Sequence, residues 1–182
     1  MEIIETNLSG AYIIYPTIHA DARGYFFESY RASILAENGM ETTFVQDNES
    51  YSEYGVIRGL HYQTGDYAQG KLVRVISGEI LDVIVDIRKD SPSYGQHISV
   101  LLNDVAKKQL YIPPGFAHGF AVLSPTCIFS YKCTAYYNPD SEQGIVYNDS
   151  DLDIDWVIPD EDRIVSDKDL KLPSFLNHHP IK

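Results

Sequence analysis

Apolar and polar residues alternate over several segments of this chain, and the clearest spans residues 71–95, KLVRVISGEILDVIVDIRKDSPSYG. Apolar side chains recur at every second position on both sides of a Ser-Gly pair: Val73, Val75, Leu81, Val83, Val85 and Ile87. A period of two is typical of β-strands. Ser77 and Gly78 favour a turn between the two runs. The segment therefore predicts two consecutive strands.

Further short apolar segments follow, separated by turn residues: ISVLLND, KQLYIPP, GFAVLS and CIFSYKCTAYY. Many short strands at close spacing favour an all-β sandwich or barrel. Interior and exterior positions alternate along each strand of a barrel, so polar side chains in the interior rows are candidate site residues.

Helical pattern is scarce. Residues 31–38, RASILAEN, followed by Gly39, predict one short helix with a glycine stop. Residues 138–144, NPDSEQG, carry a loop signal, and the Asp- and Pro-rich last 30 residues predict an ordered tail with a short helix. No repeat or linker divides the chain. We expect one domain over residues 1–182, with a core at about 10–150 and a C-terminal extension at about 151–182.

Composition fits an ordinary globular protein, with 44% hydrophobic residues among 182. The net charge of −12 argues against a nucleic-acid partner, which would require a basic surface. An anionic small ligand would need a local group of Arg and Lys. Cys127 and Cys133 are the only cysteines, so a disulfide framework is not expected. The N-terminus lacks a signal-peptide pattern and no run reaches 18 apolar residues, which predicts a soluble, cytoplasmic protein without a membrane partner.

Two histidines lie in short apolar segments flanked by glycine, His61 in IRGLHYQ and His118 in GFAHGF. A lone histidine in such a context is more often structural than catalytic, and we keep that interpretation for His19 and His97. A metal site in a barrel usually needs closely spaced histidines on one strand. The sequence has no His-x-His, so a bound metal is not expected.

Cations and phenols gather near His61 in the sequence. Arg58 precedes it by three residues, Lys71 follows it by ten, and the segment SYKCTAYY adds tyrosines. Histidine, lysine and tyrosine in one pocket suit proton transfer at a carbon beside a carbonyl, for which no cofactor is needed. No phosphate-binding glycine loop is present. A phosphate-bearing substrate would be held by side chains such as Arg23, Arg58 and Lys168.

Seven motifs in order carry a resemblance to a known family: DARGYFFESY, FVQDNESYS, IRGLHYQ, AQGKLVRVISGEILDVIVDIRKDSPSYGQ, YIPPGFAHGFAVLS, YKCTAYYNPDSE and DIDW. From about residue 2 to about residue 176 the chain resembles the dTDP-4-dehydrorhamnose 3,5-epimerases. The resemblance implies an all-β, cupin-like jelly-roll barrel with a few short peripheral helices. It also implies a metal-free isomerase that inverts C3 and C5 of dTDP-4-dehydro-6-deoxy-D-glucose, in dTDP-L-rhamnose biosynthesis.

Catalytic roles follow from the matching motifs. His61 resembles the general base, Lys71 the residue that stabilises the enolate, and Tyr131 the proton donor across the ring. The family's S-x-K-D pattern matches SDKD and makes Asp169 the orienting partner of the histidine, with Asp167 as a near competitor.

The same resemblance implies a set of substrate-binding residues. Tyr137 resembles the tyrosine that stacks on thymine, and nine other positions match residues that contact the nucleotide sugar: Arg23, Glu28, Gln46, Asp47, Asn48, Arg58, His118, Glu142 and Lys168. The family is usually homodimeric. The YFFESY segment can cross the dimer, so Arg23 and Glu28 are expected to reach the ligand of the other subunit.

Two alternatives stay open at the level of sequence. A relative that inverts only C3 or only C5 of a nucleotide 4-ketosugar keeps the same His, Lys and Tyr. A non-catalytic sugar-nucleotide-binding cupin shares the barrel, although the complete set of His61, Lys71 and Tyr131 argues against it.

Overall fold

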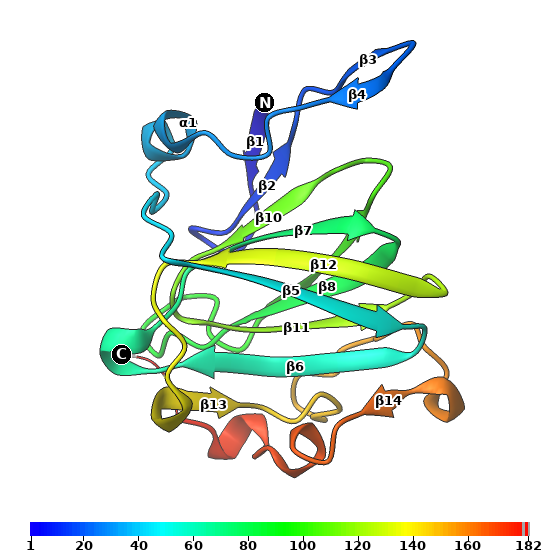
Figure 1. Cartoon of the computed structure of the whole chain (residues 1–182). Helices are drawn as coiled ribbons and strands as arrows, with labels where there is room; N and C mark the ends of the chain where they lie inside the picture. Colours follow the sequence, from blue (N-terminus) through cyan, green and yellow to red (C-terminus); the bar gives the residue numbers. More distant parts are fainter. Residues whose placement is uncertain (180, 182) are drawn as a thin grey trace.

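A computed structural model describes residues 1–179 and residue 181. Two stacked β-sheets dominate it (Figure 1). The first sheet has the strand order β1, β2, β10, β7, β12, β5. Their bounds are β1 Glu2–Glu5, β2 Tyr12–Tyr15, β10 Gln109–Ile112, β7 Lys71–Ser77, β12 Thr126–Cys133 and β5 Gln46–Glu53.

The second sheet has the order β13, β6, β11, β8, β9, and β14 pairs with β6 in parallel. Their bounds are β13 Glu142–Gly144, β6 Val56–Gln63, β11 Phe116–Val122, β8 Glu79–Asp86, β9 His97–Asn103 and β14 Ile164–Val165. Together the sheets form the all-β, cupin-like jelly roll that the sequence predicted. The two strands predicted within 71–95 are β7 and β8, which meet at Gly78 with a φ of 91°.

The main core lies between the sheets, where both inner faces contribute apolar side chains. Its largest members include Phe116, Phe120 and Phe129. Phe120 and Phe129 pack against each other from opposite sheets, with ring centroids 4.6 Å apart and ring planes tilted by 44°. Both of these rings also line a cavity between the sheets.

The C-terminal extension covers the outer face of the second sheet. Leu81, Val83 and Val85 on β8 pack there with Trp156 and Ile158 of the extension. Strand β8 is therefore buried on both faces. This packing supports the proposal that the whole chain is one domain. The extension contains the short 3₁₀ turns η3 Asp160–Asp162, η4 Asp169–Lys171 and η5 Phe175–Asn177.

Two local predictions meet different outcomes. The predicted helix is α1, Ala32–Glu37, followed by Gly39 at a φ of 75°. The predicted loop 138–144 instead contains the 3₁₀ turn η2, Pro139–Ser141, and strand β13, which pairs with β6. Turn residues dominate that segment, but its backbone gains a partner because the edge of β6 is free there. One further 3₁₀ turn, η1, spans Gly65–Tyr67.

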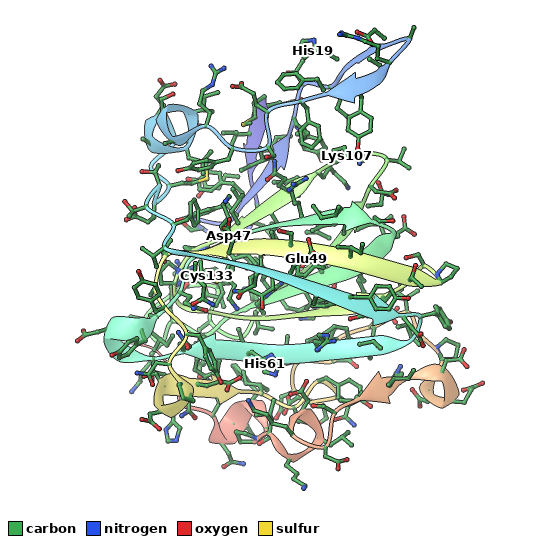
Figure 2. The ribbon with its side chains drawn as sticks, in the orientation of Figure 1. His19, Asp47, Glu49, His61, Lys107 and Cys133 are labelled. Carbon is green, nitrogen blue, oxygen red and sulfur yellow. The ribbon has the colours of Figure 1, made fainter. Side chains whose placement is uncertain are left out.

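A hairpin made of β3, His19–Asp21, and β4, Gly24–Phe26, projects away from both sheets (Figure 1). Its aromatic side chains Tyr25 and Phe26 are 59% and 68% exposed. The Lys107 ammonium lies 4.7 Å from the centre of the Tyr25 ring, beneath the hairpin (Figure 2). None of the helices in the described residues has the length and hydropathy of a membrane-spanning helix.

Candidate active site

A β-bulge on β6 places two functional side chains on the same face of the strand. His61 pairs with His118 and Arg58 pairs with Phe120 across β6 and β11, so two residues on β6, Gly59 and Leu60, oppose the single Gly119 on β11. Strict alternation would turn Arg58 and His61 to opposite faces, because they are three residues apart. The extra residue of the bulge brings both into the barrel.

Glycines make that bulge possible. Gly59 has a φ of 130°, which side-chain-bearing residues rarely adopt. A Cβ on Gly59 would lie 2.5 Å from the Cα of Gly119 on β11. The two backbones therefore approach as closely as they do only because neither position has a side chain.

The carboxylate of Asp169, on η4, completes a pair with His61. Its Oδ1 lies 2.8 Å from His61 Nε2, and its Oδ2 accepts the Gly59 N–H at 3.3 Å. The Asp169 N–H donates to the Ser166 hydroxyl at 3.1 Å. Asp169 is buried, whereas Asp167, the other candidate from the sequence, is exposed. Burial raises the pKa of Asp169, but the hydrogen bonds and charge of its neighbours, His61 above all, lower it below its usual range.

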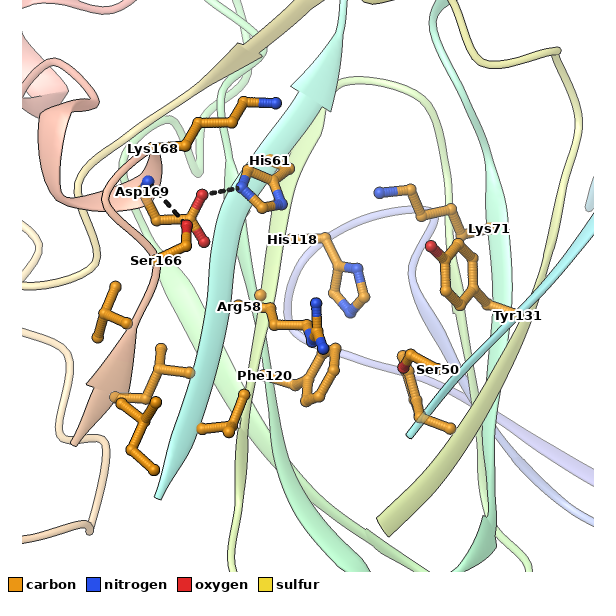
Figure 3. A pocket seen from close by; sticks show the side chains of 16 residues that line it. Ser50, Arg58, His61, Lys71, His118, Phe120, Tyr131, Ser166, Lys168 and Asp169 are labelled. Carbon is orange, nitrogen blue, oxygen red and sulfur yellow. Dashed lines mark hydrogen bonds and ion pairs between the residues drawn. The ribbon is translucent and has the colours of Figure 1, made fainter. Parts of the chain in front are cut away.

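His61, Lys71 and Tyr131 converge on one cavity of about 520 Å³, which Asp169 also lines. Tyr131 and Lys71 face His61 from the opposite sheet (Figure 3). Nε2 of His61 is occupied by Asp169, so Nδ1 is the nitrogen available for a ligand. This arrangement places a base and a phenol on opposite walls with a cation beside them.

The cavity changes the ionisation of both opposing groups. Burial lowers the pKa of Lys71, and the nearby carboxylates of Asp82 and Glu142 act in the other direction. Burial raises the pKa of Tyr131, which keeps the phenol protonated at neutral pH and able to donate. A protonated phenol opposite a carboxylate-bound imidazole can give up a proton while the imidazole takes one.

A second histidine–carboxylate pair lies beside the first. His118 Nε2 is 3.0 Å from Asp82 Oδ2, and both residues are buried. Burial lowers the pKa of His118 while Asp82 opposes that shift, so the neutral imidazole is favoured. Asp82 is not among the residues predicted from the sequence. A carboxylate in the middle of the apolar run EILDVIVDI was the signal that would have identified it.

A smaller cavity of about 260 Å³ shares His61, Lys71 and Tyr131 with the first. Polar side chains from the predicted binding set line it: Gln46, Asn48, Tyr137 and Glu142. Lys168 Nζ and the Tyr137 hydroxyl both donate to Glu142 Oε2, at 2.6 and 2.7 Å. The Tyr137 side chain remains exposed at the mouth.

Three predicted binding residues lie away from these cavities in the chain itself. Asp47 is exposed on the outer face of β5 and pairs with Lys132 at 2.9 Å. Arg23 binds Asp21 on the projecting hairpin, and Glu28 binds Arg31. Within the described residues, no group of three or more His, Cys, Asp or Glu is arranged to hold a metal ion.

Fold and cavity together define a cupin-like barrel with a histidine–carboxylate pair facing a tyrosine. A family model described as dTDP-4-dehydrorhamnose 3,5-epimerase matches residues 5–177. A relative of that name from Methanothermobacter thermautotrophicus is 52% identical over 167 residues, 91% of this chain and 90% of the relative.

Solved structures agree with that match. The dTDP-4-dehydrorhamnose 3,5-epimerase of Elizabethkingia anophelis NUHP1 is 48% identical with a TM-score of 0.94, and 97% of each chain is covered. The dTDP-6-deoxy-D-glucose-3,5-epimerase of Legionella pneumophila Philadelphia 1, in complex with dTDP-4-keto-L-rhamnose, is 47% identical with a TM-score of 0.92, covering 97% of this chain and 93% of that one. The chain belongs to the dTDP-4-dehydrorhamnose 3,5-epimerase family.

Proposed function

We propose that the protein epimerises C3 and C5 of dTDP-4-dehydro-6-deoxy-D-glucose and thereby forms dTDP-4-dehydro-L-rhamnose, a step of dTDP-L-rhamnose biosynthesis. It is an isomerase of the family defined above. The observation that carries the residue assignment is the facing pair: His61, bound to Asp169, lies across one cavity from Tyr131.

The first step is proton removal. His61 Nδ1 takes the proton from the carbon beside the C4 ketone, and the electron pair of that C–H bond moves into the enolate. The Asp169 carboxylate fixes the tautomer and stabilises the imidazolium that forms. Lys71 stabilises the negative charge on O4. Removing a donor from a site of this kind typically costs roughly 3–4 kcal/mol of transition-state stabilisation.

The second step inverts the centre. The Tyr131 hydroxyl delivers its proton to the opposite face of the same carbon, and the enolate collapses back to the ketone. His61 then carries an added proton and Tyr131 lacks one, so a proton must pass from the imidazolium to the phenolate before the second carbon is inverted, and again before the next turnover. Exchange with water at that stage would place solvent hydrogen at each inverted carbon.

The smaller cavity is the proposed route of the nucleotide. Tyr137 at its mouth offers a face for stacking on the base, which contributes roughly 1–3 kcal/mol per base. Arg58, Lys168 and Asn48 supply donors for the diphosphate and sugar, and His118 contacts the sugar beside His61. Glu142 holds Lys168 and Tyr137 in place before the ligand binds.

A homodimer belongs to the same proposal. The β3–β4 hairpin, whose turn contains Arg23, projects away from both sheets and exposes the apolar faces of Tyr25 and Phe26. Arg23 lines neither cavity of its own chain. These features suit an arm that reaches the cavity of a second copy and brings Arg23 and Glu28 to its ligand. We also propose a cytoplasmic location, because a charged nucleotide sugar does not cross a bilayer unaided.

Incubation with dTDP-4-dehydro-6-deoxy-D-glucose in heavy water, coupled to a reductase and followed by proton NMR, tests the reaction. We expect deuterium at both C3 and C5. Label at one carbon would assign a single-site epimerase, and no label would leave only a sugar-nucleotide-binding protein. His61→Ala should lower turnover by roughly 10²–10⁴-fold, and treatment with EDTA should leave the rate unchanged.

A further inference from the structure

The inner face of β5 carries polar side chains only. The strand alternates between exposed positions and positions that face the barrel, and the inward row consists of Gln46, Asn48, Ser50 and Ser52. Barrel interiors of this size are normally filled by apolar side chains. The absence of apolar side chains from this row indicates that the inner face of β5 contacts a polar molecule.

Three of these four side chains have protein partners. Gln46 accepts the Tyr137 N–H at 2.8 Å and donates to Asn48 at 3.0 Å. The Asn48 amide donates to the Cys133 sulfur at 3.6 Å. Ser52 accepts from Arg58 Nε at 3.2 Å and so holds the guanidinium at the cavity wall.

Ser50 differs from the other members of the row. Its Oγ is buried and has no hydrogen-bond partner among residues 1–179 and 181. The residue lines the larger cavity. Ser50 is paired with Phe129 in the ladder between β5 and β12, and Asn48, the preceding inward residue of β5, is paired with Tyr131. In Figure 3 it lies below Tyr131 and across from Arg58.

A buried hydroxyl without a partner is costly, and such groups in proteins are usually satisfied. Ser50 lies between the phenol proposed to donate a proton and the guanidinium held by Ser52. A ligand bound in the cavity would therefore supply the hydrogen-bond partner that the Ser50 hydroxyl lacks. We propose that the Ser50 hydroxyl hydrogen-bonds an oxygen of the nucleotide sugar, either a hydroxyl of the hexose or an oxygen of the diphosphate. This inference rests on the proposed function, because it takes the nucleotide sugar as the ligand.

Calorimetric binding of dTDP-L-rhamnose and of dTDP alone to the full-length protein and to Ser50→Ala tests the proposal. Removing the hydroxyl should weaken binding of dTDP-L-rhamnose by roughly 3- to 30-fold, the range expected for losing one hydrogen bond. An equal loss for dTDP identifies a phosphate oxygen as the partner. Unchanged binding of dTDP identifies a hydroxyl of the hexose.

Thermal unfolding of the free protein separates ligand binding from a structural role. The Ser50 hydroxyl makes no hydrogen bond to the described residues, so Ser50→Ala should leave the melting temperature without ligand unchanged or raise it. Ser99→Ala, on the exposed face of β9, is the matched control and should change neither quantity. Ser50→Thr retains the hydroxyl and should keep more affinity than Ser50→Val, which has the same shape without it.

Wild-type affinity of Ser50→Ala for both ligands would overturn the inference. Failure of the unsubstituted protein to bind either ligand would overturn both the inference and the proposed function. Binding with the predicted loss at Ser50, but without deuterium incorporation in the epimerase assay, would overturn the proposed reaction alone.

Discussion

Asp169 uses both of its carboxylate oxygens, one on the His61 imidazole and one on the Gly59 N–H of the β-bulge. The same side chain therefore orients the proposed base and stabilises the backbone that presents it. An amide at this position retains one acceptor but cannot hold the imidazolium by charge.

We expect Asp169→Asn to lower kcat by roughly 10²–10⁴-fold, because the imidazole loses both its fixed tautomer and its counter-charge. Steady-state kinetics would measure this. The double variant His61→Ala/Asp169→Asn should be no slower than His61→Ala, since both residues act in one unit. Independent, multiplicative losses would contradict the pairing.

Asp86 makes a different residue-scale prediction, on stability. It is fully buried at the end of β8 and accepts hydrogen bonds from Arg88, Ser91 and Ser93. Burial alone would raise its pKa, but these bonds lower the pKa to about 2. A carboxyl whose pKa is lower in the folded than in the unfolded protein contributes its full stabilisation at pH values above 3.8, its usual pKa. The contribution is lost as the pH falls through about 2, the pKa in the folded protein.

Asp86→Asn should therefore lose about 2 kcal/mol of unfolding free energy at neutral pH. The difference from the wild type should shrink between pH 4 and pH 2, as followed by urea unfolding at several pH values. Asp90→Asn, at an exposed position of the following loop, is the control. A difference that stays constant down to pH 2 would argue against this role.

Part of the proposed site was predicted from residue types alone. His61 and Lys71 carry chemistry that an apolar strand does not need, whereas Tyr131 was selected among the nearby tyrosines by the resemblance to the family. The resemblance to the family added Asp169, which the structure pairs with His61. Asp82 was not predicted, although its carboxylate interrupts an apolar run. Ser50 was not predicted because serine is common in every kind of segment.

At the scale of elements, strands β7 and β8 followed from their period of two, but the bulge on β6 did not. A sequence pattern records which residues are apolar and contains no sign of an inserted backbone residue. The glycines were visible in the sequence, yet their function depends on how closely β6 and β11 approach each other.

Gly59→Ala should destabilise the protein by about 1–3 kcal/mol or more and abolish most activity, because its Cβ would overlap the backbone of β11. Chemical unfolding and turnover would record the two effects. Gly24→Ala provides a matched control: Gly24 has a φ of 126°, close to the 130° of Gly59, but no atom within 4 Å of an added Cβ. Equal destabilisation at both sites would attribute the effect to φ and not to the close approach.

At the scale of the whole molecule, the projecting hairpin gives the proposed homodimer a functional test. Arg23 is 90% exposed in the single chain and lies outside both cavities. If it serves the second copy, a defect in Arg23 on one subunit and a defect in His61 on the other fall in the same cavity, and the second cavity of that dimer stays intact.

Arg23→Ala and His61→Ala should each be impaired as separate homodimers. After the two are unfolded together and refolded as a mixture, activity should recover to about a quarter of the wild-type rate, because half the dimers are mixed and each has one intact cavity. Sedimentation would establish the dimer. No recovery from a mixture shown to contain mixed dimers would place Arg23 in its own subunit's site.

The carboxylate partner of His61 comes 108 residues later in the chain, in the extension that wraps the second sheet. Strands of both sheets can pair before that segment docks, since most of their ladders need none of its atoms. Strand pairing in the barrel and orientation of the proposed base therefore depend on different segments of the chain. A chain cut before η4 would keep its imidazole, lysine and phenol on paired strands and lose the carboxylate that orients the imidazole.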